Sequence, residues 1–386
     1  MPQLISQLHT PTLQVATALV LLFSSAAAVL LWLSARSERY TRYWAAGYAA
    51  ITGGLILSAL RGQLPIPLTV IASNALIVAG GAWLVNGTAI YCRRDHWHWP
   101  AGTLAALIAA LFLVLVYVVP SFRLRVIIIA IYMLSVCVVM ATLLWRHTTP
   151  GSRWLQRLLA GLLAVQVSFY ALLASVRLIP TGAADYLDAP AAFNALYLNA
   201  LLMIVAVLFG FAALTHRRLS LHLHYAANHD PLTGALNRRA LDLEIDHQRS
   251  ARQPLTLVLL DLDHFKRLND THGHHIGDLA LIAFTETVRS GLRRNDSLGR
   301  IGGEEFCLLL PATDAMAAAH IVERLRCRVE AIELPEAPAA RFTVSAGIAT
   351  SPPCASDEAS LMRAADRALY LAKAAGRNRV ICAAEN

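Results

Sequence analysis

Seven apolar stretches occupy most of the first 215 residues, at roughly 11–34, 43–60, 66–91, 100–120, 124–145, 155–176 and 192–215. A helix needs about 20 apolar residues to cross a hydrocarbon core of about 30 Å. The hydrophobic content of the whole chain, 56%, is also high for a soluble protein. We therefore expect residues 1–215 to form an α-helical membrane bundle of about seven spans, with a sensory or anchoring role.

The placement of arginine predicts how this bundle lies in the membrane. Residues 1–220 hold fourteen arginines and only four acidic residues, so the basic excess lies between apolar stretches and does not indicate nucleic-acid binding. Loops on one side hold nine of these arginines: Arg36, Arg39, Arg42, Arg93, Arg94, Arg146, Arg153, Arg217 and Arg218. Loops on the other side hold four: Arg61, Arg123, Arg125 and Arg177. Cytoplasmic loops are the more basic ones, so we expect an odd number of spans, the N-terminus outside and the C-terminal part in the cytoplasm.

Residues 221–386 have the composition of a soluble domain, with 21 acidic and 19 basic residues. A linker helix is expected over 216–229, where it would couple two protomers as a coiled coil. Beyond it, strands are expected at 255–262, 297–301, 305–310, 341–350 and 379–383, and helices at 238–250, 264–272, 277–292, 313–332 and 357–375. Helices mixed with antiparallel strands make residues 230–386 an α+β domain. The six cysteines show no CxxC or His-spaced pattern, which is typical of reduced thiols.

A short motif, Gly302-Gly303-Glu304-Glu305-Phe306, separates the two middle strands. Glycines permit a tight turn and close approach of a ligand, because no Cβ blocks it. Two adjacent carboxylates are costly unless a cation neutralises them, although a solvated hairpin turn would explain them equally well in isolation. The strand 255–262 delivers a further carboxylate, Asp261, from its C-terminal end. Carboxylates from two such strands are the arrangement of two-metal nucleotidyl transfer.

With this pair of motifs the chain resembles the GGDEF-domain diguanylate cyclases, in the GGEEF variant. The resemblance runs from about Asp230 to Val380, and its motifs stand in the family's order. They are Asp230-Pro-Leu-Thr-Gly234, Asn237-Arg238-Arg239, Asp261-Leu-Asp263, Phe265-Lys266, Asn269-Asp270, Gly273-His274, Gly277-Asp278, Arg300 with the GGEEF, and Lys373-Ala-Ala-Gly376-Arg377-Asn378. The family implies a central five-stranded sheet similar to the palm of class III nucleotide cyclases.

The resemblance assigns the catalytic and metal-binding roles to four residues. Asp261, the Leu262 carbonyl and Glu304 are expected to bind Mg²⁺, or Mn²⁺ in its place, since such ions prefer hard oxygen ligands. Glu305 completes the acidic cluster, either on a second metal ion or by helping to remove the proton of the 3′-hydroxyl. Asp263 is expected to lie on the other face of the strand from Asp261 and to have a structural role.

Substrate contacts follow from the same resemblance. Asn269 and Asp278 would read guanine, with His274 contacting the substrate between them, and buried polar readers of this kind discriminate strongly against the wrong base. Lys266, Lys373 and Arg377 would hold the triphosphate. An argument independent of the family supports the role of the two lysines. Of the 33 lysine and arginine residues in the chain, only Lys266 and Lys373 are lysine. A compact ammonium serves as a point charge for phosphate.

The run Arg293-Arg294-Asn295-Asp296, five residues before the GGEEF, resembles the family's inhibitory product site. There Arg293 would grip phosphate and guanine, Asp296 would read a second guanine edge, and Arg324 on the following helix would add a contact. The alternative is a charged helix end without a ligand.

Together these features predict an inner-membrane diguanylate cyclase that condenses two GTP to cyclic di-GMP and two pyrophosphates as a homodimer. One alternative is a catalytically silent membrane receptor that binds GTP or cyclic di-GMP, but such a receptor has no need to keep metal ligands. Another is a transporter or channel with a regulatory domain, which the scarcity of charges within the apolar stretches disfavours.

Overall fold

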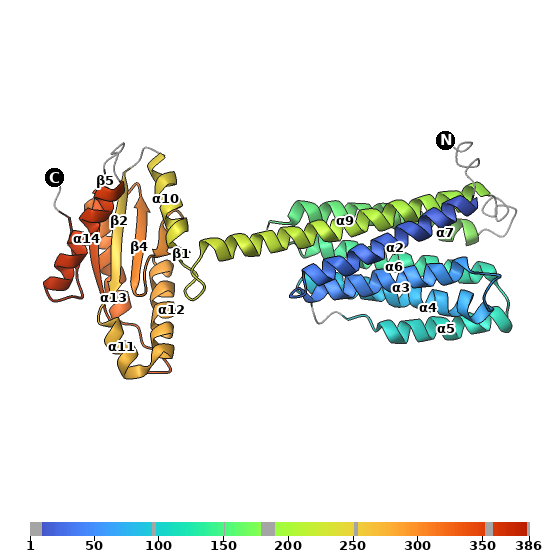
Figure 1. Ribbon diagram of the computed structural model, residues 1–386, viewed down its shortest axis with the longest axis horizontal. Coiled ribbons are helices and arrows are strands. Elements are labelled where there is room, and N and C mark those ends of the chain that lie inside the picture. Colours follow the sequence, from blue (N-terminus) through green and yellow to red (C-terminus); the bar gives the residue numbers. More distant parts are fainter. Residues whose placement is uncertain are drawn as a thin grey trace. The chain divides into compact units, whose positions relative to one another are not determined.

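The computed structural model describes residues 10–94, 98–149, 151–178, 190–250, 254–351 and 358–383. The chain divides into two compact units, Met1–Leu221 and His222–Asn386. Figure 1 shows the first unit as a group of long helices and the second as a sheet covered by helices.

The named elements of the N-terminal unit are all helices. Its elements are α2 (Thr10–Ser34), α3 (Arg39–Ala59), a π-helical turn η1 (Pro67–Ala72), α4 (Ser73–Tyr91), α5 (Ala101–Tyr117), α6 (Phe122–Arg146), α7 (Arg153–Leu178) and α9 (Pro190–Asn228). Five stretches of these described helices are long and apolar enough to cross a membrane: Val15–Ser34, Pro67–Tyr91, Phe122–Arg146, Arg153–Leu172 and Leu201–Asn228. The expected seven spans are therefore not confirmed; α5 is apolar but has only 17 residues, and α3 carries Arg39 and Arg42 in its first turn.

Aromatic side chains hold three of these helices together near the start of α3. The rings of Trp44 and Phe211 stack in parallel with centroids 3.8 Å apart, which joins α3 to α9. Tyr91, at the end of α4, meets Tyr40 edge-on at 5.1 Å. Such ring pairs add about 0.5–1.5 kcal/mol beyond their burial. This end of the unit is therefore a well-packed junction of α3, α4 and α9.

The C-terminal unit contains one mixed sheet of six strands. They are β1 (Leu236–Asn237), β2 (Leu255–Leu262), β3 (Ser297–Arg300), β4 (Glu305–Pro311), β5 (Val344–Ser351) and β6 (Val380–Cys382), in the order β1-β3-β4-β2-β5-β6. β1 pairs in parallel with β3, and β6 in parallel with β5, while the inner pairs are antiparallel. The expected count of five strands is wrong, because a two-residue strand such as β1 has no periodicity to reveal it.

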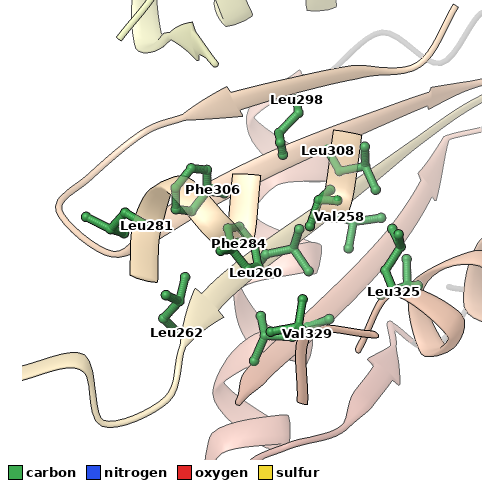
Figure 2. Close-up of a cluster of buried hydrophobic side chains, with 14 of the residues drawn as sticks. Val258, Leu260, Leu262, Leu281, Phe284, Leu298, Phe306, Leu308, Leu325 and Val329 are labelled. Carbon is green, nitrogen blue, oxygen red and sulfur yellow. The ribbon is translucent and has the colours of Figure 1, made fainter. Parts of the chain in front are cut away.

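Helices cover both faces of this sheet. Side chains from α12 (His274–Ser290) and α13 (Ala315–Glu330) pack on one face with those of the strands. Figure 2 shows this core, in which Phe284 and Phe306 meet between Leu260 and Leu281. α10 (Arg238–Ser250) and α14 (Glu358–Ala374) contribute to a second cluster with the alternate side chains of the strands, including Leu257 and Leu309. The result is a three-layer α/β/α arrangement.

The central strand β2 determines where the functional residues lie. All eight of its residues are buried, as a continuous run of Leu, Val and Thr predicts for a strand covered on both faces. It pairs with β4 on one side and β5 on the other. The short helix α11 (Phe265–His272) begins just after it. Polar residues at the C-terminal end of β2 therefore lie between two neighbouring strands and the start of α11.

Candidate active site

Three carboxylates and one ammonium group gather where β2 ends and β4 begins. Asp261 on β2 is the register partner of Glu305 on β4. The Leu262 amide donates to the Glu304 carbonyl, with N and O 3.2 Å apart, so Glu304 lies beside the end of β2. Lys373, near the end of α14, reaches Asp261: its Nζ lies 2.7 Å from Oδ2 of the nearly buried carboxylate. The structure thus brings together residues that are more than 100 positions apart in sequence.

Hydrogen bonds from Arg300 hold the Gly302–Gly303 turn. Its guanidinium donates to the Gly302 and Gly303 carbonyls at 2.7–3.2 Å and to Asp230 Oδ1 at 2.9 Å. A Cβ at Gly302 would come within 2.5 Å of Glu305 Oε2, so a side chain there would displace the Glu305 carboxylate. Arg300 therefore fixes the turn that carries Glu304 and Glu305.

Asp230 anchors this arginine from the turn that precedes β1. Its Oδ1 also accepts hydrogen bonds from the Thr233 amide and hydroxyl, at 2.9 and 2.7 Å. Burial alone would raise the pKa of Asp230, but the hydrogen bonds from Thr233 and Arg300 lower it below the ordinary 3.8. Sequence reasoning assigned no role to Asp230 or Arg300. Their only signal was membership of the motifs, because a pair 70 residues apart has no local pattern.

Asp263 has the structural role that the sequence predicts. Its carboxylate accepts from the Ser345 hydroxyl, the Thr343 hydroxyl and the Asn378 amide at 2.7, 2.7 and 3.0 Å. Strand alternation is not the reason, since residues two apart in a strand share a face; β2 ends at Leu262, before Asp263. Asp263 ties the end of β2 to β5 and to the turn after α14, and so positions Lys373 indirectly.

The carboxylates at the end of β2 carry negative charge that the protein only partly neutralises. Burial raises the pKa of Asp261; Lys373 opposes this rise, and Glu305 and Asp263 add to it. The pKa of Glu304 is raised by burial and by Asp261, against the effect of Lys373. Both shifts indicate that another cation would be favourable here.

A divalent ion fits this donor set. Carboxylate oxygens and a backbone carbonyl are the hard ligands that Mg²⁺ and Mn²⁺ prefer. Within the described ranges no three His, Cys, Asp or Glu side chains already converge as a metal centre. Lys373 lies on Oδ2 of Asp261, so the ammonium would share this carboxylate with a metal ion or give way to it.

A second group of polar residues lies on α11 and at the start of α12. Asn269 Oδ1 is buried and has no hydrogen-bond partner, and a Cβ at Gly277 would collide with it. His274 and Asp278, one turn apart on α12, are exposed. A buried acceptor without a partner costs about 1–3 kcal/mol. This unmet acceptor, beside a glycine that leaves it space, indicates a site for a hydrogen-bond donor.

The other two predicted phosphate ligands lie near the same strand ends. Lys266 is exposed on α11, in the helix that directly follows β2. Arg377 follows α14 in a left-handed backbone conformation, with φ of 60°. Its neighbour Asn378 bonds Asp263, as described above, so the turn that carries Arg377 is fixed to the end of β2.

The predicted inhibitory residues form a closed turn after α12. The Arg293 amide donates to Asp296 Oδ2 at 2.7 Å, and the Asp296 amide donates back to the Arg293 carbonyl at 3.1 Å. The Arg293 side chain is exposed, as is Arg324 on α13. Arg328, which sequence reasoning did not single out, reaches this turn: its Nη1 would lie 3.1 Å from a Cβ at Gly291. The turn is thus built by Asp296 itself, and it leaves the Arg293 guanidinium available.

Comparisons with known proteins concern the C-terminal unit. Residues 227–379 match the family model described as "Diguanylate cyclase, GGDEF domain". The "Probable diguanylate cyclase DgcC" of Escherichia coli (strain K12) is 36% identical over 192 residues, which are 48% of this chain and 52% of that protein. "Diguanylate cyclase DgcM" of the same strain is 41% identical over 172 residues, which are 43% of this chain and 41% of that protein. The chain thus spans about half the length of these curated relatives.

One solved structure to which this chain is similar contains the coiled coil and GGDEF domain of DgcB from Caulobacter crescentus in complex with c-di-GMP. Its sequence is 31% identical to the present one. The match covers 46% of this chain and 99% of that chain, with a TM-score of 0.42.

Proposed function

We propose that this chain is a membrane-bound diguanylate cyclase, which condenses two GTP into cyclic di-GMP with release of two pyrophosphates. The observation that carries the proposal is the gathering of Asp261, Glu304 and Glu305 at the end of β2, with Lys373 as their only described ammonium partner. The GGDEF match over residues 227–379 supports the reaction class.

The residues have distinct roles in this reaction. Asp261, the Leu262 carbonyl and Glu304 would hold Mg²⁺ or Mn²⁺, which would supply positive charge to the phosphates when bound. Lys266, Lys373 and Arg377 bind the triphosphate. Asn269 and Asp278 read guanine, supported by the unmet acceptor of Asn269, and His274 contacts the same nucleotide. Glu305 has one of two roles: it is a second metal ligand, or it is the group that takes the proton of the 3′-hydroxyl.

Product formation requires two protomers. Each site holds one GTP, and each 3′-hydroxyl attacks the α-phosphorus of the other nucleotide while pyrophosphate leaves. The protein therefore acts as a homodimer with its sites face to face. Residues 1–215 serve as the membrane region, 216–229 as the coupling helix and 230–386 as the catalytic domain, in the bacterial inner membrane with the N-terminus outside. The membrane region sets how often the catalytic domains meet.

Product would also regulate the enzyme. Cyclic di-GMP binds the exposed Arg293 and the half-buried Asp296, with Arg324 as a further contact, and keeps the two sites apart. The hydrogen bond from the Arg293 amide occupies Oδ2 of Asp296 and leaves Oδ1 for a guanine edge.

The test is an assay of the purified full chain in detergent with GTP and Mg²⁺. We expect formation of cyclic di-GMP, with two pyrophosphates released for each cyclic di-GMP formed. A silent receptor, the second candidate, would bind GTP or cyclic di-GMP under the same conditions without releasing pyrophosphate, and that result would contradict the proposal.

A further inference from the structure

A cavity of about 460 Å³ opens in the N-terminal unit, where the start of α3 and the end of α4 meet α9 at Arg218. Three arginines line it, Arg39, Arg93 and Arg218, together with one acidic residue, Glu38. Every lining residue belongs to the N-terminal unit, so the cavity is separate from the proposed active site.

Basic residues outnumber acidic ones among the described residues that line the cavity. Arg218 pairs with Glu38, whose Oε2 lies 3.4 Å from Arg218 Nε, and Arg93 presents a second, exposed guanidinium at the cavity. An anion that entered the cavity would be attracted by these guanidinium groups.

The Arg218 guanidinium is held in a fixed position. Its Cζ lies 5.3 Å from the ring centroid of Tyr40 and 5.7 Å from that of Tyr91. Its Nη1 also donates to the Tyr91 carbonyl at 3.4 Å. A cation held over two aromatic rings is pre-organised, so little side-chain entropy is lost when it binds a ligand.

Tyr40 forms part of the cavity wall and is only 1% exposed. Its ring lies beside the Arg218 guanidinium, so it helps to hold that cation at the cavity.

Arg93 is placed at the cavity by an unusual backbone conformation. It follows the end of α4 with φ of 57°, in the left-handed region where glycine is the usual residue. A non-glycine residue in that region costs of order 1 kcal/mol or more. The chain thus keeps an exposed arginine at a position where glycine would be more stable.

We propose that this cavity binds a phosphate group. An arginine guanidinium can donate two parallel hydrogen bonds to phosphate oxygens, and Ser37 adds a neutral partner. The phosphate would be carried either by a small soluble compound or by the headgroup of an anionic lipid. The ligand's contact with Arg218 would reach α9, which continues as one helix to Asn228.

The experiment compares Arg93→Gln with Arg94→Gln in the full chain. Arg94 is the neighbouring arginine, is equally exposed and does not line the cavity; its guanidinium contacts His147. Both changes remove one charge. Neither alters the backbone requirement at residue 93, because glutamine and arginine are both non-glycine residues.

In the first arm, inorganic phosphate is titrated into each protein in uncharged detergent at constant ionic strength, and binding is measured by calorimetry. We expect wild type and Arg94→Gln to bind alike and Arg93→Gln about tenfold more weakly, as for the loss of one charged hydrogen bond. Arg93→Lys should recover part of the affinity.

In the second arm, thermal unfolding is compared in nanodiscs of phosphatidylcholine alone and of phosphatidylcholine with phosphatidylglycerol. A stabilisation by phosphatidylglycerol that Arg93→Gln loses and Arg94→Gln keeps identifies a lipid headgroup as the source. A difference between Arg93→Gln and Arg94→Gln that is seen only in the titration with inorganic phosphate identifies a soluble ligand. If Arg93→Gln and Arg94→Gln behave alike in both arms, the cavity is not a phosphate site.

Discussion

Lys373 Nζ lies 2.7 Å from Asp261 Oδ2, so the ammonium group occupies one oxygen of the carboxylate that is expected to bind metal. The same lysine is expected to hold the triphosphate of GTP. If Lys373 has the proposed role, one group would serve both partners in turn: it would neutralise Asp261 before the nucleotide arrives and move to phosphate afterwards.

This relationship predicts that Lys373→Gln has opposite effects on two ligands. Without nucleotide, Mg²⁺ should bind the variant more tightly, because the competing ammonium is gone. GTP should bind about tenfold more weakly or worse, because a charged phosphate contact is lost. Calorimetric titration of each ligand measures both effects. Arg367→Gln, on the exposed side of the same helix, is the control and should change neither. A loss of affinity for both ligands would contradict the exchange.

Asp278→Ala tests the guanine site. It should weaken GTP binding far more than ATP binding, because only contacts specific to guanine are lost. Asp270→Ala, an exposed carboxylate on α11, is the control. Equal losses for the two nucleotides would show that Asp278 does not read the base.

Arg293→Ala with Asp296→Ala tests product inhibition. Initial rates in GTP should stay nearly unchanged, since both residues lie outside the catalytic cluster. The inhibition constant for cyclic di-GMP should rise by well over tenfold, because each lost charged contact is worth roughly 1.5–3 kcal/mol. Progress curves with added cyclic di-GMP measure this.

Two further variants make this test specific. Arg293→Ala alone keeps the hydrogen bond from the backbone amide of residue 293 to Asp296, so a turn that merely loses its shape would not explain its effect. Arg294→Ala should leave inhibition intact. If cyclic di-GMP still inhibits the double variant, residues 293–296 are only a charged helix end and not a product site.

Asp230 gives the C-terminal unit a stability that depends on pH. Its pKa in the folded protein lies below 3.8, so its hydrogen bonds with Thr233 and Arg300 stabilise the fold above that value and are lost as the pH falls further. Asp230→Asn should reduce the free energy of unfolding by about 1–3 kcal/mol near neutral pH. The difference from wild type should shrink in acid.

Urea unfolding at several pH values measures this difference. Glu336→Gln is a suitable control, since the pair of Glu336 with His275 is exposed, with both side chains more than half accessible. A difference for Asp230→Asn that stays constant with pH would mean that its charge has no part in the effect.

Patterns along the chain predict the main elements of the C-terminal unit well. β2 covers residues 255–262 and α10 covers 238–250, as expected, because a continuous apolar run and an amphipathic period are local signals. β1 was missed because it has two residues and depends on its pairing with β3. The helix expected over 216–229 is the last part of α9, which runs out of the last apolar stretch and continues to Asn228.

The candidate site was predictable as a set of residues but not as a network. Sequence motifs indicated Asp261, Glu304, Glu305 and Lys373 individually. The contact between Lys373 and Asp261 joins α14 to β2, and no pattern along the chain encodes a contact over that distance. The same holds for Arg300 and Asp230, which fix the Gly302–Gly303 turn. Such contacts appear only once the sheet has brought distant segments together.

The central claim is that the carboxylates at the end of β2 catalyse formation of cyclic di-GMP. It is tested most directly by measuring product from GTP and Mg²⁺ with Glu304→Gln, Glu305→Gln and the control Glu286→Gln, an exposed residue on α12. The account predicts that the first two form no measurable cyclic di-GMP while keeping the thermal stability of wild type, and that Glu286→Gln is as active as wild type. Near-normal product formation by Glu304→Gln or Glu305→Gln would contradict it.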